Sequence, residues 1–234
     1  MKRFAFILLA AIGLVSCNAI EFAKGEVIEK SFTINGEVDG LAVSAGFDVI
    51  VDPTLPRGEV RVITHSDLMD NVNVEVDGTT LNIDLNGWAI QAKTLKGRIP
   101  AYDYNTIAVS GGVDLEWHDC TSPSLSLAAS GGADVDITTH SEEVAIATSG
   151  GVDLEIAGSC KRLTISASGG SDIDASKLRA EDVEVAVSGG ADVDVYATNS
   201  LKVRASGGAD VRYAGNPTHK DIDKDGGADV TPAH

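Results

Sequence analysis

Apolar residues alternate with polar ones along most of the chain. In one typical segment, a Gly-Gly pair is preceded by Leu125, Leu127 and Ala129, and it is followed by Val135 and Ile137. A period of two indicates β-strands with one buried face. A glycine pair between the strands indicates a sharp corner, because glycine adopts backbone angles that residues with a Cβ resist. The pattern therefore predicts short strands on both sides of each corner.

The corner belongs to a phrase, Ser-Gly-Gly-x-Asp followed by Val, Leu or Ile, that recurs through the second half of the chain. Its copies begin at Ser110, Ser130, Ser149, Ser168, Ser188, Ser206 and, with aspartate in place of serine, Asp225. Successive copies are separated by 20, 19, 19, 20, 18 and 19 residues. A nearly fixed period is typical of a repeat architecture.

Two arrangements suit such repeats. A hairpin array reverses its direction at each Gly-Gly, whereas a solenoid turns a corner and stacks each strand on its copy in the next coil. The nearly constant spacing favours the solenoid over a hairpin array, a sandwich or a propeller. Parallel crossovers are generally right-handed. The sequence therefore predicts an all-β fold, a single-stranded right-handed parallel β-helix with coils of about 19 residues.

Residues 31–109 lack the phrase but keep the alternation, and residues 44–49 (Ser-Ala-Gly-Phe-Asp-Val) resemble a degenerate copy. We interpret 31–109 as degenerate N-terminal coils and 110–234 as regular coils with a C-terminal cap. Together they predict about ten coils and a rod roughly 50 Å long. Asp77-Gly78 fits a hairpin turn, so a local antiparallel excursion there is an alternative.

The N-terminus has the pattern of a lipoprotein signal. Basic Lys2 and Arg3 precede an apolar run, which ends in Leu-Val-Ser-Cys at Cys17. The run is shorter than the ~20 residues needed to span a bilayer. We predict a signal peptide at 1–16, acylation of Cys17 and a lipidated tether at 17–30. The protein would then be anchored in a membrane of the cell envelope, at the outer membrane or cell surface.

The composition narrows the choice of partners. The chain has 18 basic and 35 acidic residues, a net charge of −17. This charge disfavours nucleic acids and anionic lipid head groups, which bind basic patches. It is compatible with cations and with glycan or protein ligands. Aromatic residues make up only 5% of the chain, so the core must consist of Val, Ile, Leu and Ala.

The motifs follow one another in a specific order. Phe32-x-Ile34 comes first, followed by Gly-Phe-Asp-Val at 46–49, Leu81-x-Ile83, the serial Ser-Gly-Gly-x-Asp phrases and Gly-Asn-Pro at 215–217. This order resembles the putative auto-transporter adhesin, head GIN domain family over nearly all of residues 31–230. The resemblance implies a right-handed β-helix in an exported or lipid-anchored bacterial protein. It implies no catalytic residues.

The aspartates of the phrase share one phase and should form an exposed row. They are Asp114, Asp134, Asp153, Asp172, Asp192, Asp210 and Asp229. A second row follows two residues later, at Glu116, Asp136, Glu155, Asp174 and Asp194. Neighbouring carboxylates repel each other unless cations screen them. The rows could bind cations or another partner, but we favour a solvated face that keeps sheets from sticking together.

A possible calcium site lies near the C-terminus. Asp221, Asp223 and Asp225-Gly226 match the start of an EF-hand loop, and Asp229 occupies its ninth position. The twelfth position is Pro232 instead of glutamate, so only a weak Ca²⁺ site is predicted. No other cofactor is expected.

Cysteine, histidine and aromatic residues give weaker indications. Cys120, His140 and Cys160 lie at nearly the same phase, but two coil spacings separate the cysteines, which is too far for a shared ion or a disulfide. We therefore interpret their phase as a coincidence. The larger aromatic side chains and one histidine could line a glycan-binding shelf or pack the core; they are Trp88, Tyr102, Tyr104, Trp117 and His118.

The sequence favours a structural or binding module, such as an adhesin, with an unspecified ligand and no enzymatic activity. The alternative is a polysaccharide-degrading β-helix enzyme. Such an enzyme needs a basic residue or Ca²⁺ among clustered carboxylates. Arg204 and Arg212 are the nearest basic residues in the regular coils, and neither stands in an acidic cluster that departs from the repeat.

Overall fold

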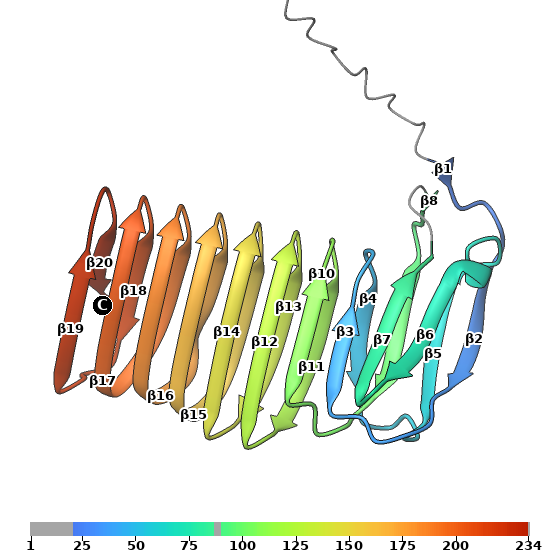
Figure 1. The fold of residues 1–234 in the computed structure, drawn as a ribbon, viewed down its shortest axis with the longest axis horizontal. Coiled ribbons are helices and arrows are strands. Elements are labelled where there is room, and N and C mark those ends of the chain that lie inside the picture. Colours follow the sequence, from blue (N-terminus) through green and yellow to red (C-terminus); the bar gives the residue numbers. More distant parts are fainter. Residues whose placement is uncertain (1–20, 87–89, 234) are drawn as a thin grey trace, which may run out of the picture.

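The computed structural model describes residues 21–86 and 90–233. They form a right-handed parallel β-solenoid of about seven turns, with coils of about 19 residues (Figure 1). The only helical element among the described residues is a 3₁₀ turn, Met69–Asn71. None of the described helical structure is long and apolar enough to cross a bilayer. The predicted fold class is confirmed.

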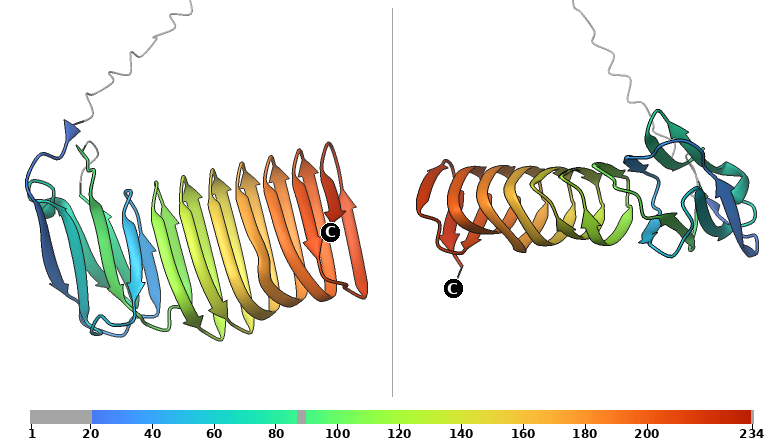
Figure 2. Two further views of the ribbon diagram at one scale, coloured as in Figure 1. Left: turned by 180° about the vertical axis from the view of Figure 1, so that it is seen from behind. Right: turned by 90° about the horizontal axis from the view of Figure 1, so that it is seen from below.

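Each regular coil contributes one strand to each of two facing sheets. The sheet before the corners, here called the serine sheet, contains β10 (Thr106–Ser110), β12 (Ser124–Gly131), β14 (Glu143–Gly150), β19 (His219–Lys224) and the second halves of β15 (Asp153–Gly169), β16 (Asp172–Gly189) and β17 (Asp192–Gly207). The sheet after the corners, here called the aspartate sheet, contains β11 (Asp114–Thr121), β13 (Asp134–His140), the first halves of β15 to β17, β18 (Asp210–Ala214) and β20 (Asp229–Pro232). The regular coils form a narrow spiral in Figure 2.

The Gly-Gly corners of successive coils are aligned in one row along the upper edge of the solenoid in Figure 1. Gly150 pairs in register with Gly169, which pairs in turn with Gly189. From Gly151 onwards, the second glycine of each pair donates its N–H to the preceding corner, as in Gly170 N–H to Gly150 O at 3.0 Å and Gly190 N–H to Gly169 O at 2.8 Å. The corners therefore extend the hydrogen-bond ladders of the two sheets around the bend.

Only the first glycine of a typical pair needs to be glycine. Gly169 has a φ of +95°, and a Cβ built on it would lie 2.9 Å from Gly150 O. A Cβ on Gly170 would have no atom within 4 Å. The sequence assigns the corner to the pair as a whole, whereas the structure assigns the backbone strain and the close contact to its first member.

The interior is filled by rows of aliphatic side chains. The serine sheet contributes one row of almost fully buried residues: Leu127, Ile146, Ile165, Val185 and Val203. The aspartate sheet contributes a facing row: Val135, Leu154, Ile173, Val193 and Val211. Burial of such side chains stabilises the fold by about 1.5–3 kcal/mol each, before the entropy of ordering them is subtracted.

The degenerate copy at 44–49 is a true corner of the solenoid. It joins β3 (Gly40–Val43) to β4 (Asp48–Asp52). β3 pairs parallel with β10 and β4 pairs parallel with β11, so this coil stacks directly on the regular coils.

The rest of the N-terminal region departs from the predicted succession of coils. β7 (Thr80–Leu85) and β9 (Leu95–Pro100) pair parallel with β3 and β4 on their outer side, so coil 40–52 lies between coils formed later in the chain. The expectation of about ten coils is therefore wrong, and about seven turns form.

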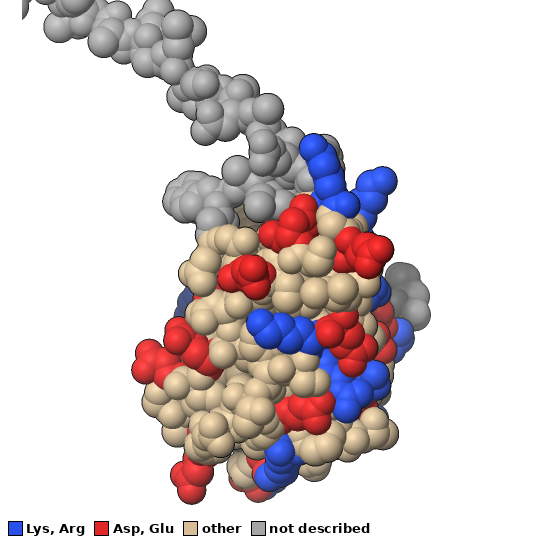
Figure 3. Space-filling model, turned by 90° about the vertical axis from the view of Figure 1, so that its right-hand side faces the viewer, with Lys and Arg blue, Asp and Glu red and all other residues tan. Residues whose placement is uncertain are grey.

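Antiparallel strands close this end. β2 (Val27–Thr33) pairs with β5 (Glu59–His65), and β5 pairs with β9. β6 (Val72–Asp77) forms a hairpin with β7, which confirms the antiparallel excursion considered at Asp77-Gly78. β1 (Glu21–Phe22) and β8 (Ile90–Gln91) form a separate two-stranded sheet. Antiparallel neighbours need only short connections, so they can cover the open end of a parallel stack. Figure 3 views this end and shows side chains of both charges around an uncharged surface.

The C-terminal end is protected by charge. Three inward positions of β19 carry Lys220, Ile222 and Lys224, and each extends a row of buried apolar residues in β17. The Lys220 ammonium lies 5.3 Å from the ring of Tyr213, and the Lys224 ammonium pairs with Asp229 at 3.1 Å. Inward-pointing charges prevent another coil from stacking on an exposed edge. The last coil stands where a C-terminal cap is predicted, and the cap stays a prediction.

We expect Gly169→Ala to lower the free energy of unfolding by about 2–4 kcal/mol, because it adds a strained φ and a backbone clash. Gly170→Ala is the matched control and should change it by no more than about 0.5 kcal/mol. Urea unfolding followed by circular dichroism measures both. Equal losses for the two variants would contradict the assignment of the constraint to the first glycine.

Replacing both cap lysines, Lys220→Val with Lys224→Val, should make the solenoid self-associate through its exposed end. Light scattering after size exclusion should show a larger fraction of dimers or higher oligomers for this variant than for the parent protein. The control removes two outward lysines, Lys161→Val with Lys202→Val, and should leave the mass unchanged. A cap variant with the parent's mass would show that these charges do not protect the edge.

Candidate functional site

The aspartate sheet presents its predicted acidic row on its outer face. The aspartates pair in register from strand to strand through Asp114, Asp134, Asp153, Asp172, Asp192, Asp210 and Asp229. The row continues one coil further, to Asp48 of the degenerate copy. Lys96 then faces Asp48 with an ion pair of 2.6 Å, which ends the run of carboxylates. The row predicted from the sequence omits Asp48, because the corner before it lacks the Ser-Gly-Gly phrase.

The second acidic row lies beside the first and is partly neutralised. Lys177 pairs with Glu155. Arg212 approaches Asp194 at 3.7 Å. These exposed pairs contribute little individually, since solvent screens them. Among the described residues, the first row has side-chain ion pairs only near its two ends, so no basic side chain pairs with its central carboxylates.

Partial burial, together with repulsion within the rows, raises the pKa of two carboxyl groups. Partial burial raises the pKa of Asp114, and the neighbouring Asp134 and Asp48 raise it further. The pKa of Asp194 is also raised, first by burial and then by nearby carboxylates, while Arg212 opposes the change. Both carboxyl groups therefore bind a proton more readily in the folded protein than their ordinary values indicate.

The four residues of the predicted calcium site do not converge. Asp221 and Asp223 lie on β19 of the serine sheet, whereas Asp229 lies on β20 of the aspartate sheet. Asp225 lies at the corner between them, where its carboxylate accepts the Gly226 N–H at 2.7 Å. The segment 219–224 is a strand instead of a coordinating loop. Across 21–86 and 90–233, no three acidic, histidine or cysteine side chains are placed to share an ion. Calcium binding by these residues stays an untested prediction.

Cys120, His140 and Cys160 occupy different rows. Cys120 pairs with Thr139, and His140 pairs with Thr121 and Ser159 in the neighbouring row. Both thiols are free and buried, and burial raises the pKa of each to about 11. They are therefore packing residues with little thiolate at neutral pH.

The outer face of the serine sheet is shallow and lined by small side chains. Two adjoining hollows of about 600 and 310 Å³ share Ala147 and Thr148. Alanine and serine line most of both, while Arg204, Asp223 and Asp225 bound the larger one at its C-terminal end. This face is open and carries no convergent set of polar groups.

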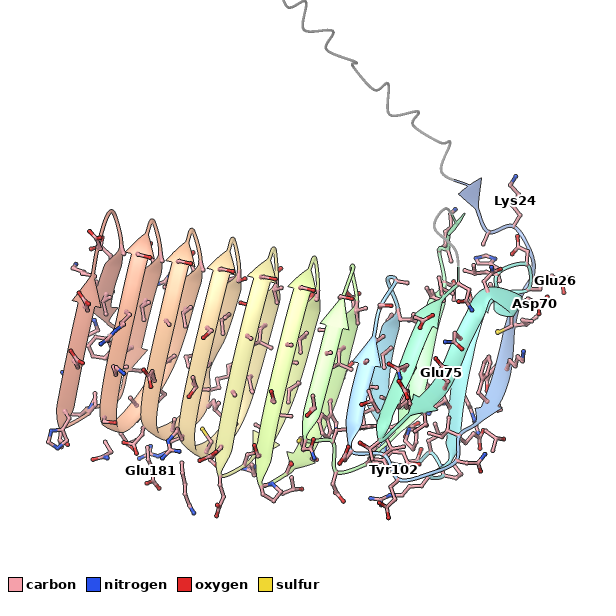
Figure 4. The ribbon with its side chains drawn as sticks, viewed as in Figure 1. Lys24, Glu26, Asp70, Glu75, Tyr102 and Glu181 are labelled. Atoms are coloured by element: carbon pink, nitrogen blue, oxygen red, sulfur yellow. The ribbon has the colours of Figure 1, made fainter. Side chains whose placement is uncertain are left out.

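A smaller pocket of about 190 Å³ lies where the N-terminal region meets the first regular coil. We call it the junction pocket. Its polar lining consists of Arg57, Tyr102, Asp103, His118, Asp119 and Thr121. Figure 4 places Tyr102 at the lower edge of the molecule, opposite the glycine corners.

A bulge in β11 forms one wall of the junction pocket. The register of β11 against β13 shifts between Trp117 and Cys120, and Asp119 adopts a φ of +60°. This extra residue accounts for a 20-residue step in the repeat, between Ser110 and Ser130. The bulge directs His118 and Asp119 away from the regular ladder. The junction pocket therefore coincides with an interruption of the repeat.

Aromatic side chains form the floor of the junction pocket. Tyr104 is fully buried between Tyr102 and Trp117, with ring centroids 5.7 and 5.5 Å away in edge-to-face geometry. The Tyr104 hydroxyl donates to Pro100 O at 3.0 Å. Tyr104 and Trp117 are thus core residues, while Tyr102 is half-buried and lies beside Arg57. Trp88, the other aromatic of the predicted shelf, lies outside the described residues.

A comparison with protein families matches residues 37–217 to the putative auto-transporter adhesin, head GIN domain family. The chain belongs to this family. The match spans the coil 40–52, the strands β5 to β9 and the regular repeats as far as residue 217. It confirms the resemblance found in the order of the sequence motifs.

Solved structures share the fold. A putative adhesin from Bacteroides fragilis is similar with a TM-score of 0.84 and 21% identity, over 91% of this chain and 99% of the other. A putative lipid binding protein from Parabacteroides distasonis has a TM-score of 0.71 and 16% identity, over 91% and 99%. A putative adhesin from the same species has a TM-score of 0.65 and 17% identity, over 91% and 99%. A comparison with curated proteins finds no match.

We expect Asp114→Asn to raise the thermal unfolding midpoint by about 1–2 °C at pH 7. The raised pKa means that the folded state disfavours the charged form, so the substitution removes a penalty that exists only above the carboxyl pKa. As the pH falls through the carboxyl pKa, the aspartate becomes protonated in the folded and the unfolded state, and the difference should vanish. Scanning calorimetry from pH 3 to pH 8 measures it, with Asp70→Asn as a control. A difference that grows as the pH falls would contradict this account.

The two buried thiols should not react with Ellman's reagent in the folded protein at pH 8, since burial keeps them protonated and inaccessible. A Cys17→Ala variant isolates their reaction. The colour should develop only after denaturant is added. Rapid labelling of the folded variant would show that the coils open locally around Cys120 or Cys160.

Proposed function

We propose that the protein is a lipid-anchored protein of the cell envelope whose solenoid acts as an adhesin-like binding module. The observation that carries this proposal is the strict register of the coils. Because the same exposed side chain recurs at one spacing along each face, each face offers a row of equivalent groups. Such a row suits a polymeric or multivalent partner, whose own repeat can engage several coils at once.

The family and the related structures support a binding role. Two of the similar structures are described as putative adhesins and one as a putative lipid binding protein. None of these descriptions names an enzyme. The strongly acidic surface favours a neutral or basic partner over nucleic acid.

The first described strand, β1, lies at one end of the solenoid, which suits a module anchored through its N-terminus. β1 lies at the antiparallel end, and the regular coils extend away from it (Figure 1). A tether that precedes residue 21 would hold this end near the membrane and leave the regular coils exposed. Acylation of Cys17 remains part of the proposal, since this residue lies outside the described part of the chain.

The geometry of the regular coils favours binding over polysaccharide cleavage. Arg212 lies within the second acidic row beside Asp194, and Arg204 pairs in register with Asp223 on the serine sheet. In register, each arginine is paired with one carboxylate, on an open sheet face. Acid–base cleavage requires two carboxyl groups that flank one glycosidic bond, in a cleft that holds the polysaccharide.

The anchor is tested by labelling producing cells with a radioactive fatty acid. The parent chain should carry label and fractionate with membranes, whereas Cys17→Ala should lose the label and leave the membrane fraction. Ser16→Thr, next to the same bond, is a control for general damage to export. Equal labelling of the parent and the Cys17→Ala chain would exclude acylation at this residue.

The binding role is tested by attachment of producing cells to surfaces coated with neutral, amino or acidic polysaccharides. Cells that carry the protein should attach to at least one coating several-fold better than cells that lack it. The purified protein should release no new reducing ends from the same polysaccharides. Release of reducing ends would favour the enzyme, and equal attachment to every coating would contradict the adhesin-like role.

A further inference from the structure

We propose that the junction pocket is a carbohydrate-binding subsite, which holds one neutral or amino sugar ring of a glycan. The inference rests on the proposed binding role and gives it a site and a ligand class. The location of the junction pocket is the first observation in its favour. The pocket lies beside a coil with an outward bulge, and non-repeating segments of the N-terminal region complete its lining.

The polar groups of the junction pocket have hydrogen-bonding capacity to spare. The Arg57 guanidinium lies 3.8 Å from the Asp103 carboxylate, too far for a direct hydrogen bond. Within the described part of the chain, the carboxylates of Asp103 and Asp119 accept no hydrogen bond from another protein group. The Tyr102 hydroxyl accepts the Gly58 N–H at 2.9 Å and keeps its own proton to donate.

This set of donors and acceptors suits hydroxyl groups. A sugar hydroxyl both donates and accepts, so adjacent hydroxyls can bridge an arginine and a carboxylate. Carboxylates and a guanidinium form charge-assisted hydrogen bonds, which are stronger than neutral ones. The half-buried Tyr102, whose ring also lies beside the Arg57 guanidinium, adds aromatic surface for the apolar face of a sugar ring.

Size and charge restrict the ligand further. At about 190 Å³ the junction pocket is smaller than a typical site for drug-sized molecules, so it suits one ring of a longer chain. The junction pocket is lined by two carboxylates, Asp103 and Asp119, and by one arginine, Arg57. A further carboxylate, that of Glu116, is hydrogen-bonded to the lining residue His118 at 2.8 Å. Negative charge therefore exceeds positive charge at the pocket. Uronic acids and phosphorylated sugars would be repelled, whereas neutral and amino sugars would not.

The backbone at Asp119 permits a clean test. Its φ of +60° is one that glycine adopts without strain, so Asp119→Gly removes the carboxylate while preserving the bulge. Asp103→Asn removes a second charge from an exposed side chain. A matched control, Asp153→Asn with Asp172→Asn, makes a similar change of charge in the acidic row outside the junction pocket.

The experiment uses saturation-transfer NMR and calorimetry on the purified full-length protein. The probes are methyl glycosides of neutral hexoses, hexosamines and hexuronic acids. At least one neutral or amino glycoside should bind, and the uronic acids should not. Asp103→Asn with Asp119→Gly, and separately Tyr102→Ala, should weaken that binding at least tenfold. The control pair should bind as the parent does, and thermal unfolding should show that all variants remain folded.

Failure of the inference differs from failure of the binding role. If no neutral or amino glycoside binds, or if the pocket variants bind as tightly as the parent, the junction pocket is not the subsite. Attachment of cells to polysaccharide in that case would still support the adhesin-like role through another face. If the glycosides bind in the junction pocket but producing cells never attach, the subsite stands and the adhesin-like role fails.

Discussion

The structure depends on the stacking of one backbone corner on the next. At Gly169 the chain must adopt a positive φ, and the corner beneath it leaves no room for a Cβ. The neighbouring N–H then reaches the preceding corner and joins the hydrogen-bond ladders of both sheets. Because each corner fixes the position of the next, the inward aliphatic rows and the outward polar rows stay in register over the whole length of the regular coils.

Strict register has an electrostatic consequence that the fold must tolerate. Like charges recur in register from coil to coil. Partial burial raises the pKa values of Asp114 and Asp194, and repulsion from neighbouring carboxylates raises them further. The cost is tolerable because the rows face water and neighbouring cations neutralise part of them. The same outward charge discourages other sheets from stacking on this face. The inward lysines of β19 and the antiparallel strands at the other end protect the two exposed edges.

The repeat could be predicted from the sequence because period and alternation are local properties. The corner at 44–49 could also be found, since its Gly-Phe-Asp-Val keeps the phase of the later copies. The order of the N-terminal coils could not be predicted, because β7 and β9 reach β3 and β4 through pairings that no local pattern encodes. The only signal of the junction pocket in the repeat pattern is the extra residue between Ser110 and Ser130, which forms the bulge in β11. The contribution of Arg57 and Asp103 depends on tertiary structure alone.

Amide hydrogen exchange at the second glycine of each corner tests the central claim most directly. If the corners stack, the N–H groups of Gly151, Gly170, Gly190 and Gly208 are hydrogen-bonded to the preceding coil and should exchange as slowly as the flanking strands. Exchange within seconds at these four amides, with protected strands on either side, would show that the corners are independent loops. The register of the rows would then need another cause.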